Sequence, residues 1–406
     1  MLKRIPVAKL RCGMYLQELC GSWMEHPFWR TSFLIDDPAD IARIIDSGIH
    51  EAWIDTAKGI DLPDAEATDI AKRNDEVDRQ LECVAAPVAL RKTGLHEELE
   101  NARRICTRSR EAVVSMFSEV RMGHAISAES ALPLVIEIAE SVERNPGALI
   151  SLARLKTADD YTYMHSVAVC ALMLALARQL GLPEDELRKA GLAGLMHDLG
   201  KAMMPMEVLN KPGKLTDDEF AIIKSHPVEG HKLLVEGRTA DEITLDVCLH
   251  HHEKLDGSGY PDRLAGDEIS LYARMGAVCD VYDAITSNRP YKAGWDPAES
   301  IRKMAEWSAG HFDERVFQAF VRSVGIYPVG SLVRLESGRL GIVTQLGEKS
   351  LLTPRVRVFY STRSNAYIKP ELVDLARPGC QDRIRNAENP SNWHFKDLHL
   401  MWQSET

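Results

Sequence analysis

The chain lacks several features that mark membrane, secreted or duplex-binding proteins. It has no run approaching the ~18 apolar residues of a membrane helix, and no signal-peptide core near its first residue. Lysine and arginine (49) are outnumbered by aspartate and glutamate (60), which gives a net charge of −11. This balance argues against a binder of duplex nucleic acid, because such proteins usually carry a basic face. We therefore expect a cytoplasmic protein without a membrane span.

Cysteine pairs at metal-binding or redox spacing are also absent. None of the eight cysteines belongs to a CxxC pair. Cys170, Cys248 and Cys279 stand inside apolar runs, and we expect them to be small buried side chains in a reducing compartment. A metal site in this chain has no need of thiolate ligands.

The 406 residues allow two or three domains, and their patterns differ along the chain. Residues 1–65 combine strand-like alternation with a short helical segment, which predicts a small α+β N-terminal domain. Residues 66–94 are interpreted as a linker. Residues 95–325 carry helical spacing, and residues 326–406 predict a short β-rich C-terminal appendage with a tail. The expected fold class is mainly α.

The helical zone concentrates histidine. Seven of the 14 histidines lie between His165 and His252, and imidazole is both the commonest metal ligand and a good acid or base. His197 and Asp198 stand in an apolar helical run, as does Asp280. A buried aspartate is costly unless it is paired or bound to a cation. Each residue alone has a structural explanation, such as a core hydrogen bond or a helix cap, but together they favour a mixed nitrogen and oxygen metal site.

Short motifs follow one another in order through this zone. After His165-Ser166 they are HDLGK at 197–201, KPGKL at 211–215, HP at 226–227, HHEKLDGSGYP at 251–261, DVYDAIT at 280–286 and SNRPYK at 287–292. The set resembles the HD-GYP domain, a variant of the HD phosphohydrolase superfamily that hydrolyses cyclic di-GMP. The resemblance covers about residues 155–325. The N-terminal zone resembles the small domain of unknown function that precedes HD-GYP in some bacterial proteins.

The resemblance implies an all-helical, metal-dependent phosphohydrolase domain with a binuclear centre. Carried over position by position, its metal ligands correspond to His165, His197, Asp198, His226, His251, His252 and Asp280. The aspartate of the HD pair is expected to bridge the two divalent transition-metal ions. Iron or manganese is favoured, and nickel or zinc also suits such ligands. His250 corresponds to no ligand and is interpreted as a neighbour of the site.

Tyr161 determines the expected number of metals. Some members of the family place a glutamate one helical turn before the first histidine and use it to bind a third metal, whereas this chain has Tyr161 there. A neutral tyrosine cannot replace a carboxylate charge. Asp159 and Asp160 are near in sequence but face elsewhere on a helix. We therefore expect two metals.

The resemblance also assigns residues to the reaction. His197, Asp198 and Lys201 are expected to take part in catalysis, and loss of His197 or Asp198 is expected to abolish turnover. The implied substrate contacts are Lys201, Asp283, Arg289 and Lys292, among which the lysine of the HDLGK motif would contact a phosphate oxygen. A solvated basic turn is the alternative explanation for the two cations of SNRPYK. The expected first product is linear pGpG, with a second cut to GMP left open.

The Gly259-Tyr260-Pro261 segment contains no good metal ligand. The resemblance implies that this segment contacts diguanylate cyclase (GGDEF) domains. A purely structural role, in which the segment only orients His251 and His252, is an equally good explanation. Two further functions stay open at this point. The chain could hydrolyse another cyclic dinucleotide or nucleotide, because the sequence does not reveal pocket shape. It could also be an adaptor that binds cyclic di-GMP without cleaving it.

Overall fold

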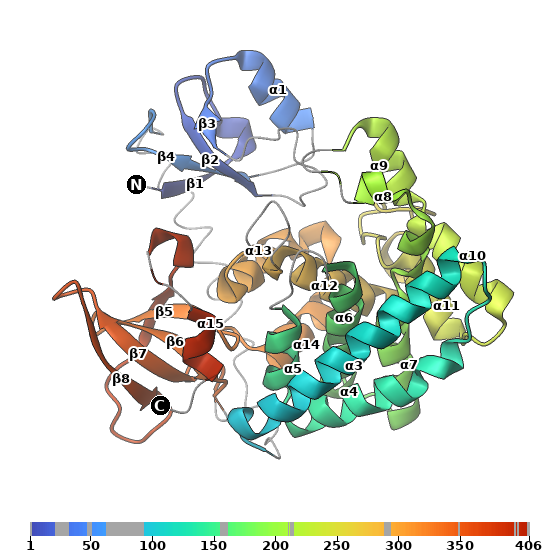
Figure 1. The fold of residues 1–406 in the computed structure, drawn as a ribbon. Helices are drawn as coiled ribbons and strands as arrows, with labels where there is room; N and C mark the ends of the chain where they lie inside the picture. Colours follow the sequence, from blue (N-terminus) through green and yellow to red (C-terminus); the bar gives the residue numbers. More distant parts are fainter. Residues whose placement is uncertain are drawn as a thin grey trace. The chain divides into compact units, whose positions relative to one another are not determined.

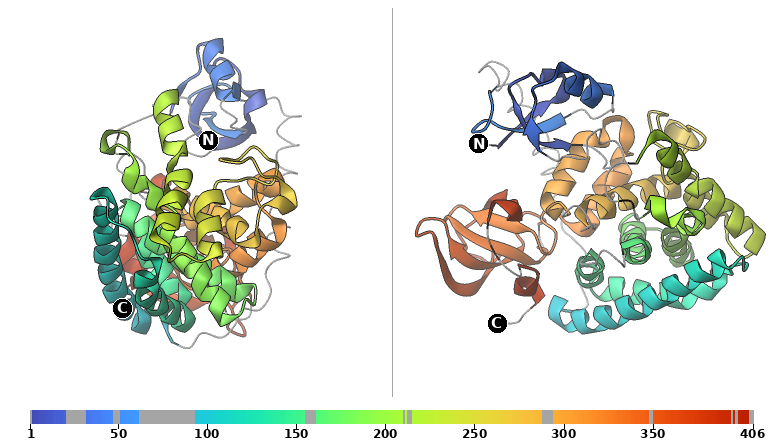
Figure 2. Two further views of the ribbon diagram at one scale, coloured as in Figure 1. Left: turned by 90° about the vertical axis from the view of Figure 1, so that its right-hand side faces the viewer. Right: turned by 45° about the horizontal axis from the view of Figure 1, so that its top comes forward.

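The chain divides into two compact units (Figures 1 and 2). One comprises Met1–Gln80 with Pro205–Ile223, and the other comprises Leu81–Met204 with Lys224–Thr406. The computed structural model describes residues 2–20, 32–46, 51–61, 93–154, 161–209, 211, 215–287, 294–347, 350–393, 395 and 398–403. None of the described helices combines the length and the apolar character that crossing a membrane requires.

The first unit begins with a four-stranded antiparallel sheet in the order β1-β4-β2-β3. Its strands are β1 (Leu2–Pro6), β2 (Tyr15–Cys20), β3 (Phe33–Leu34) and β4 (Glu51–Asp55). Asp37 accepts a 2.8 Å hydrogen bond from the amide of Ala39 at the start of α1 (Pro38–Asp46), as its Asp-Pro signal predicts. The unit also contains α8 (Met206–Leu209) and all but the last residue of α9 (Asp217–Lys224).

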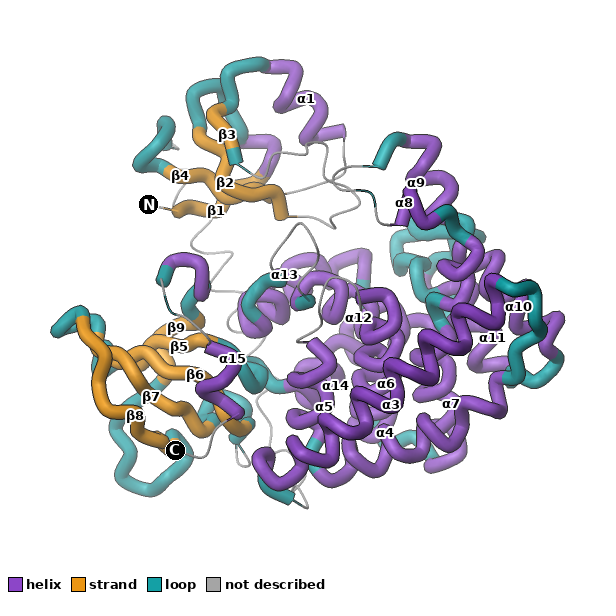
Figure 3. The backbone as a smooth tube through the Cα atoms, in the orientation of Figure 1, coloured by secondary structure: helices purple, strands orange, loops and turns teal. Residues whose placement is uncertain are grey.

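The second unit is built around α6 (Tyr161–Gln179). Its residues from Val167 to Ala177 are buried on every side, as expected for a helix that is apolar around its whole circumference. Figure 3 shows the helices that surround it. Those packed against it are α3 (Leu95–Arg121), α4 (Leu132–Arg144), α5 (Pro146–Arg154), α7 (Glu184–Met196), α12 (Leu271–Thr286) and α14 (Glu314–Val324). The helices α10 (His226–Gly237), α11 (Glu242–His250) and α13 (Pro297–His311) belong to the same unit.

A glycine lets α7 approach α6 closely. A Cβ on Gly194 would lie 3.0 Å from the Cα of Cys170 in α6, which is tighter than side chains normally pack. The close approach matters because His165 stands near the start of α6 and His197 directly follows α7. Packing of the two helices therefore brings these two histidines together.

A five-stranded antiparallel sheet follows α14, in the order β8-β7-β6-β5-β9. Its strands are β5 (Leu332–Leu335), β6 (Arg339–Gln345), β7 (Arg355–Ser361), β8 (Ala366–Asp374) and β9 (Ile384–Ala387). Asp296 joins the sheet to α13, because its Oδ1 accepts a hydrogen bond from the amide of Ala298 and its Oδ2 one from that of Leu332. The helix α15 (Leu398–Gln403), which the sequence pattern did not predict, packs on β6.

The predicted fold class is confirmed, since the chain is mainly α with two small sheets near its ends. Cys170, Cys248 and Cys279 are fully buried free thiols, as predicted. The predicted linker at residues 66–94 falls almost wholly outside the described residues, and the predicted domain boundaries stay predictions.

Gly200 gives a direct test of the packing that positions the centre. It lies in the 3-10 turn Leu199–Met203, and an added Cβ would lie 1.9 Å from the backbone oxygen of His226. Because backbone cannot rotate away, we expect Gly200→Ala to lower the free energy of unfolding by at least about 2 kcal/mol. Chemical denaturation measures the loss. Gly147→Ala is the matched control: its Cβ would meet side-chain atoms at 3.3 Å or more, so a change within about 1 kcal/mol is expected. Equal stability of the two variants would contradict the packing described.

Candidate metal centre

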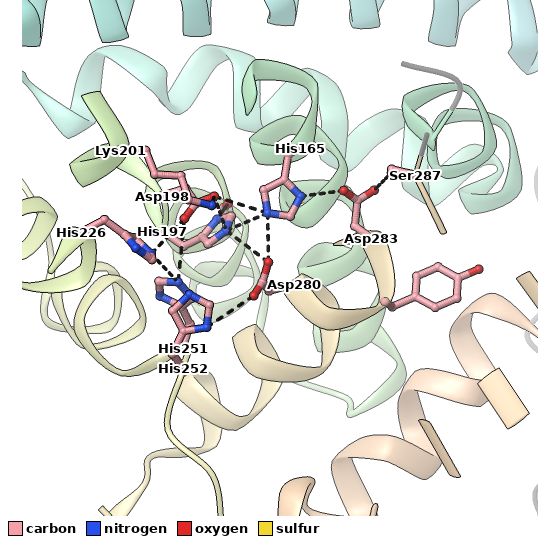
Figure 4. A network of polar contacts seen from close by, with 12 residues as sticks. His165, His197, Asp198, Lys201, His226, His251, His252, Asp280, Asp283 and Ser287 are labelled. Carbon is pink, nitrogen blue, oxygen red and sulfur yellow. Dashed lines mark hydrogen bonds and ion pairs between the residues drawn. The ribbon is translucent and has the colours of Figure 1, made fainter. Parts of the chain in front are cut away.

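Five segments far apart in sequence place their polar side chains around one point inside the helical part of the chain (Figure 4). They are α6, the end of α7 with the turn after it, the start of α10, the end of α11 and the middle of α12. The side chains they bring together are His165, His197, Asp198, His226, His251, His252 and Asp280. These are the seven residues that the sequence predicts as metal ligands.

The first cluster consists of His165, His197 and Asp280. His165 Nε2 lies 2.9 Å from Asp280 Oδ1 and 3.3 Å from His197 Nε2. Asp198 Oδ2 lies 3.4 Å from both imidazole nitrogens. All three side chains of the cluster are buried or nearly so.

The second cluster consists of His226, His251 and His252. The Nε2 atoms of His226 and His251 lie 3.3 Å apart. Asp198 Oδ1 lies 3.2 Å from His226 Nε2 and 3.9 Å from His251 Nε2. The two oxygens of Asp198 therefore face different clusters.

The donor set fits divalent cations. The Nδ1 atoms of His165 and His197 face Asp283 at 2.6 Å and the backbone oxygen of Gly194 at 2.8 Å. A neutral imidazole that donates through Nδ1 carries a lone pair on Nε2, so the two rings, once both are neutral, point their lone pairs at each other across the first cluster. Asp198 Oδ1 is also buried and makes no hydrogen bond among the described residues. A cation bound in each cluster would satisfy these atoms.

The electrostatics of the metal-free chain agree with this assignment. Burial, followed by neighbouring His197, lowers the pKa of His251 to about 3. Burial disfavours charge on Asp198, but Lys201 and His197 outweigh it and hold the pKa of this carboxyl well below its usual range. Burial also opposes charge on His197, yet Asp198 outweighs it and raises the pKa of His197. A neutral His251 and an ionised Asp198 are ready to bind metal, while His197 would release a proton on binding.

Lys201 lies at the edge of the centre. Its Nζ donates a 2.5 Å hydrogen bond to Asp198 Oδ2, and its side chain is 21% exposed whereas that of Asp198 is 1% exposed. The ammonium group thus lies on the partly exposed side of an otherwise buried group of side chains. It is placed both to balance the charge of the Asp198 carboxylate and to meet an anionic group from solvent.

Asp283, which the sequence predicts as a substrate contact, lies behind His165. Its Oδ2 accepts the hydrogen bond from His165 Nδ1, its Oδ1 accepts one from Ser287 Oγ at 3.2 Å, and its side chain is 3% exposed. Asp280 and Asp283 lie one turn apart on α12 and contact opposite nitrogens of the same ring. In this position Asp283 can orient the imidazole of His165, and its predicted contact with a substrate stays a prediction. Sequence reasoning missed Ser287 altogether, and its position one turn after Asp283 was the available signal.

Some of the remaining predicted residues are described by the structure and others are not. Arg289, Lys292 and the side chain of Tyr161 lie outside the described residues. Tyr260 stacks on His252 with ring centroids 4.7 Å apart, so Gly259-Tyr260-Pro261 adjoins the second cluster. His250, predicted to be no ligand, has Nδ1 2.7 Å from Asp246 and Nε2 3.0 Å from Asp262, both carboxylates outside the two clusters.

Comparison with known proteins also indicates an HD-type phosphohydrolase. A family model described as an HD domain matches residues 134–316, and one described as a domain of unknown function (DUF3391) matches residues 2–131. Over 403 residues the chain is 57% identical to the cyclic di-GMP phosphodiesterase PA4108 of Pseudomonas aeruginosa, which covers 99% of this chain and 96% of that protein.

Two further relatives match shorter stretches. The cyclic di-GMP phosphodiesterase response regulator RpfG of Xanthomonas campestris is 38% identical over 210 residues, covering 50% of this chain and 54% of the relative. The 3'3'-cGAMP-specific phosphodiesterase 1 of Vibrio cholerae is 39% identical over 166 residues, covering 40% of this chain and 38% of the relative. Together with the ordered motifs and a relative that matches along nearly its whole length, these matches show that the chain belongs to the HD-GYP family of the HD phosphohydrolase superfamily.

Proposed function

We propose that this chain is a metal-dependent phosphodiesterase that hydrolyses cyclic di-GMP, with linear pGpG as the first product. The observation that carries the proposal is the buried carboxylate of Asp198, whose two oxygens face two separate clusters of metal-binding side chains. The relative that matches over nearly the whole chain is described as a cyclic di-GMP phosphodiesterase, which supports the choice of substrate.

The first and second clusters each hold one divalent transition-metal ion in this proposal, with iron or manganese favoured by the family and nickel or zinc also suited to the ligands. Such a pair of cations supplies an activated water and a counter-charge for the oxygens of a phosphodiester. Asp198 would bridge the two sites. The histidines would bind through one ring nitrogen, and hydrogen bonds at Nδ1 fix the orientation of His165, His197 and His251.

Lys201 completes the site on its open side. A lysine ammonium is a compact charge with three donors, and Lys201 Nζ is already held within 2.5 Å of Asp198. A phosphate oxygen next to the bridging carboxylate would meet this ammonium, which neutralises charge that develops during attack. Arg289 and Lys292 are proposed as further contacts to the phosphate and guanine groups, from the motif alone.

Hydrolysis of a mixed cyclic dinucleotide is the second candidate function. It is favoured by the 39% identity over 166 residues to a 3'3'-cGAMP-specific phosphodiesterase. The two substrates differ in one base and not at the phosphates, so the metal centre itself does not separate them. Contact of the Gly259-Tyr260-Pro261 segment with a GGDEF domain is a further proposal from the family and is compatible with either substrate.

A direct comparison of substrates tests the proposal. Purified protein is incubated with Mn²⁺ or Fe²⁺ and with equal concentrations of cyclic di-GMP and 3'3'-cGAMP, and products are followed by chromatography. We expect pGpG from cyclic di-GMP, formed faster than any product of 3'3'-cGAMP. A preference for 3'3'-cGAMP would favour the second candidate, and binding of cyclic di-GMP without any product would indicate an adaptor.

Loss of the bridging carboxylate or of its neighbour should abolish turnover. Asp198→Asn keeps the shape but removes the charge that two cations share, and His197→Ala removes a ligand of the first cluster. We expect each to lower kcat/KM by more than the roughly 100-fold that loss of an outer-shell partner costs. His231→Ala, a histidine of α10 that lies in neither cluster, is the matched control and should keep wild-type activity. Near-normal turnover in the pure Asp198→Asn variant would refute the assignment.

Asp283 provides a graded test. Asp283→Leu removes the acceptor that orients His165, while Asp283→Asn keeps an oxygen acceptor without the charge. We expect roughly a 10–100-fold loss of metal affinity or activity in the leucine variant and a smaller loss in the asparagine variant. Metal content after dialysis, measured beside kcat and KM, distinguishes the roles. A raised KM with unchanged metal content would instead indicate that Asp283 contacts the substrate.

A further inference from the structure

His252 differs from His165, His197 and His251 in how its ring is held. His165, His197 and His251 are each anchored through Nδ1. Within the part of the chain that the structure describes, the ring of His252 makes no hydrogen bond, and its Nδ1 lies 3.7 Å from Asp280 Oδ2. Its side chain is 13% exposed, whereas no other histidine of the two clusters exceeds 2%. Since ligating histidines almost always have an outer partner, another restraint must hold this ring.

Tyr260 supplies that restraint. Its ring stacks on the ring of His252, with centroids 4.7 Å apart and planes inclined by 28°. The backbone amide of Tyr260 also donates a hydrogen bond to the backbone oxygen of His252 at 3.3 Å. The other ring neighbours of His252 among the described residues are His226 and His251, which are themselves in the second cluster. Tyr260 is therefore the contact that comes from outside the ligand set.

The position of Tyr260 is fixed in turn by the fold of the GYP loop, residues 253–263. Glu253 Oε1 accepts hydrogen bonds from the amides of Asp262 at 2.7 Å and Arg263 at 3.0 Å. These bonds tie the end of the loop to its beginning. The side chain of the residue next to His252 thus closes the loop that carries the stacked ring.

Gly259 permits the close return of the GYP loop. A Cβ at this position would lie 2.5 Å from both Glu253 Cα and the backbone nitrogen of Lys254, which no real side chain tolerates. The loop can therefore fold back against the residues after His252 only with glycine here. Gly259 thus allows the loop to approach Glu253, and Tyr260 makes the contact with the ring of His252.

We propose that Tyr260 is a positioning residue that holds the ring of His252 in the orientation that completes the second cluster, so that the GYP loop sets the affinity of one of two cations. The inference rests on the proposed function for its two-cation centre and deepens it. It gives the loop a role inside the site that requires no partner protein. Stacking restricts the rotation of both rings. It therefore gives the ring of His252 a restraint that no hydrogen bond provides.

Metal affinity measured without any nucleotide tests this directly. Tyr260→Phe keeps the stacked ring, and Tyr260→Leu keeps apolar bulk without it. Binding of Mn²⁺ is followed by competition with a chromophoric chelator. We expect wild-type affinities for both cations in the phenylalanine variant. In the leucine variant one cation should bind as in the wild type and the other about 10–100-fold more weakly.

Two controls separate this effect from misfolding. Tyr367 is 62% exposed on β8, and Tyr367→Leu should leave both affinities unchanged. The absorption spectrum of the Co²⁺-loaded protein reports ligand geometry, so it should change in Tyr260→Leu and not in Tyr260→Phe. Tyr260→Met, which also lacks a ring, repeats the test with a different side chain if the leucine variant does not fold.

Wild-type affinity for both cations in Tyr260→Leu or Tyr260→Met would overturn the proposal. Equal weakening in Tyr260→Phe would overturn it as well, because the hydroxyl and not the ring would then act. A wild-type chain that binds two cations but leaves cyclic di-GMP uncut would refute the proposed function and leave this inference intact.

Discussion

The buried carboxylate of Asp198 is the constraint on which the rest of the centre depends. A charge placed where its side chain is 1% exposed is costly unless nearby groups compensate it. Lys201 balances it on one side, and histidines from four helical segments surround it on the others. Gly194 and Gly200 allow those segments to approach closely enough. The packing of the domain thus holds one carboxylate between two clusters of side chains that could each hold a cation.

Around this carboxylate the ligands are held by different means. His165, His197 and His251 are anchored by hydrogen bonds from the side of the ring that faces away from the centre. His252 stands at the more exposed edge and is held by a stacked ring and a backbone contact from the GYP loop. The first cluster is therefore enclosed by the helical core, while the second depends on a loop. The second cluster is therefore the side of the centre that changes at the surface would affect first.

The mainly helical fold and the candidate ligands could be predicted from the sequence, because the motifs are local and the helices that carry them are strongly apolar. The seven candidate ligands, and the interpretation of His250 as a neighbour of the site, follow from the order of short motifs. The contact of Asp283 with His165 did not follow, because a spacing of one helical turn puts Asp283 on the same face as Asp280 but does not tell which nitrogen of the ring each carboxylate contacts. The helix α15 was missed because the tail has little periodicity of its own and packs on β6. The function of Gly259 needed the fold, since only the return of the chain towards Glu253 explains it.

The number and position of the cations test the central claim most directly. Anomalous scattering from crystals of the Mn²⁺-loaded protein locates each ion without reference to activity. We expect two fully occupied peaks, one beside each oxygen of Asp198, the first ligated by His165, His197 and Asp280 and the second by His226, His251 and His252. A single peak would contradict a centre in which one carboxylate bridges two cations, and a third fully occupied peak near Tyr161 would contradict the expected count of two.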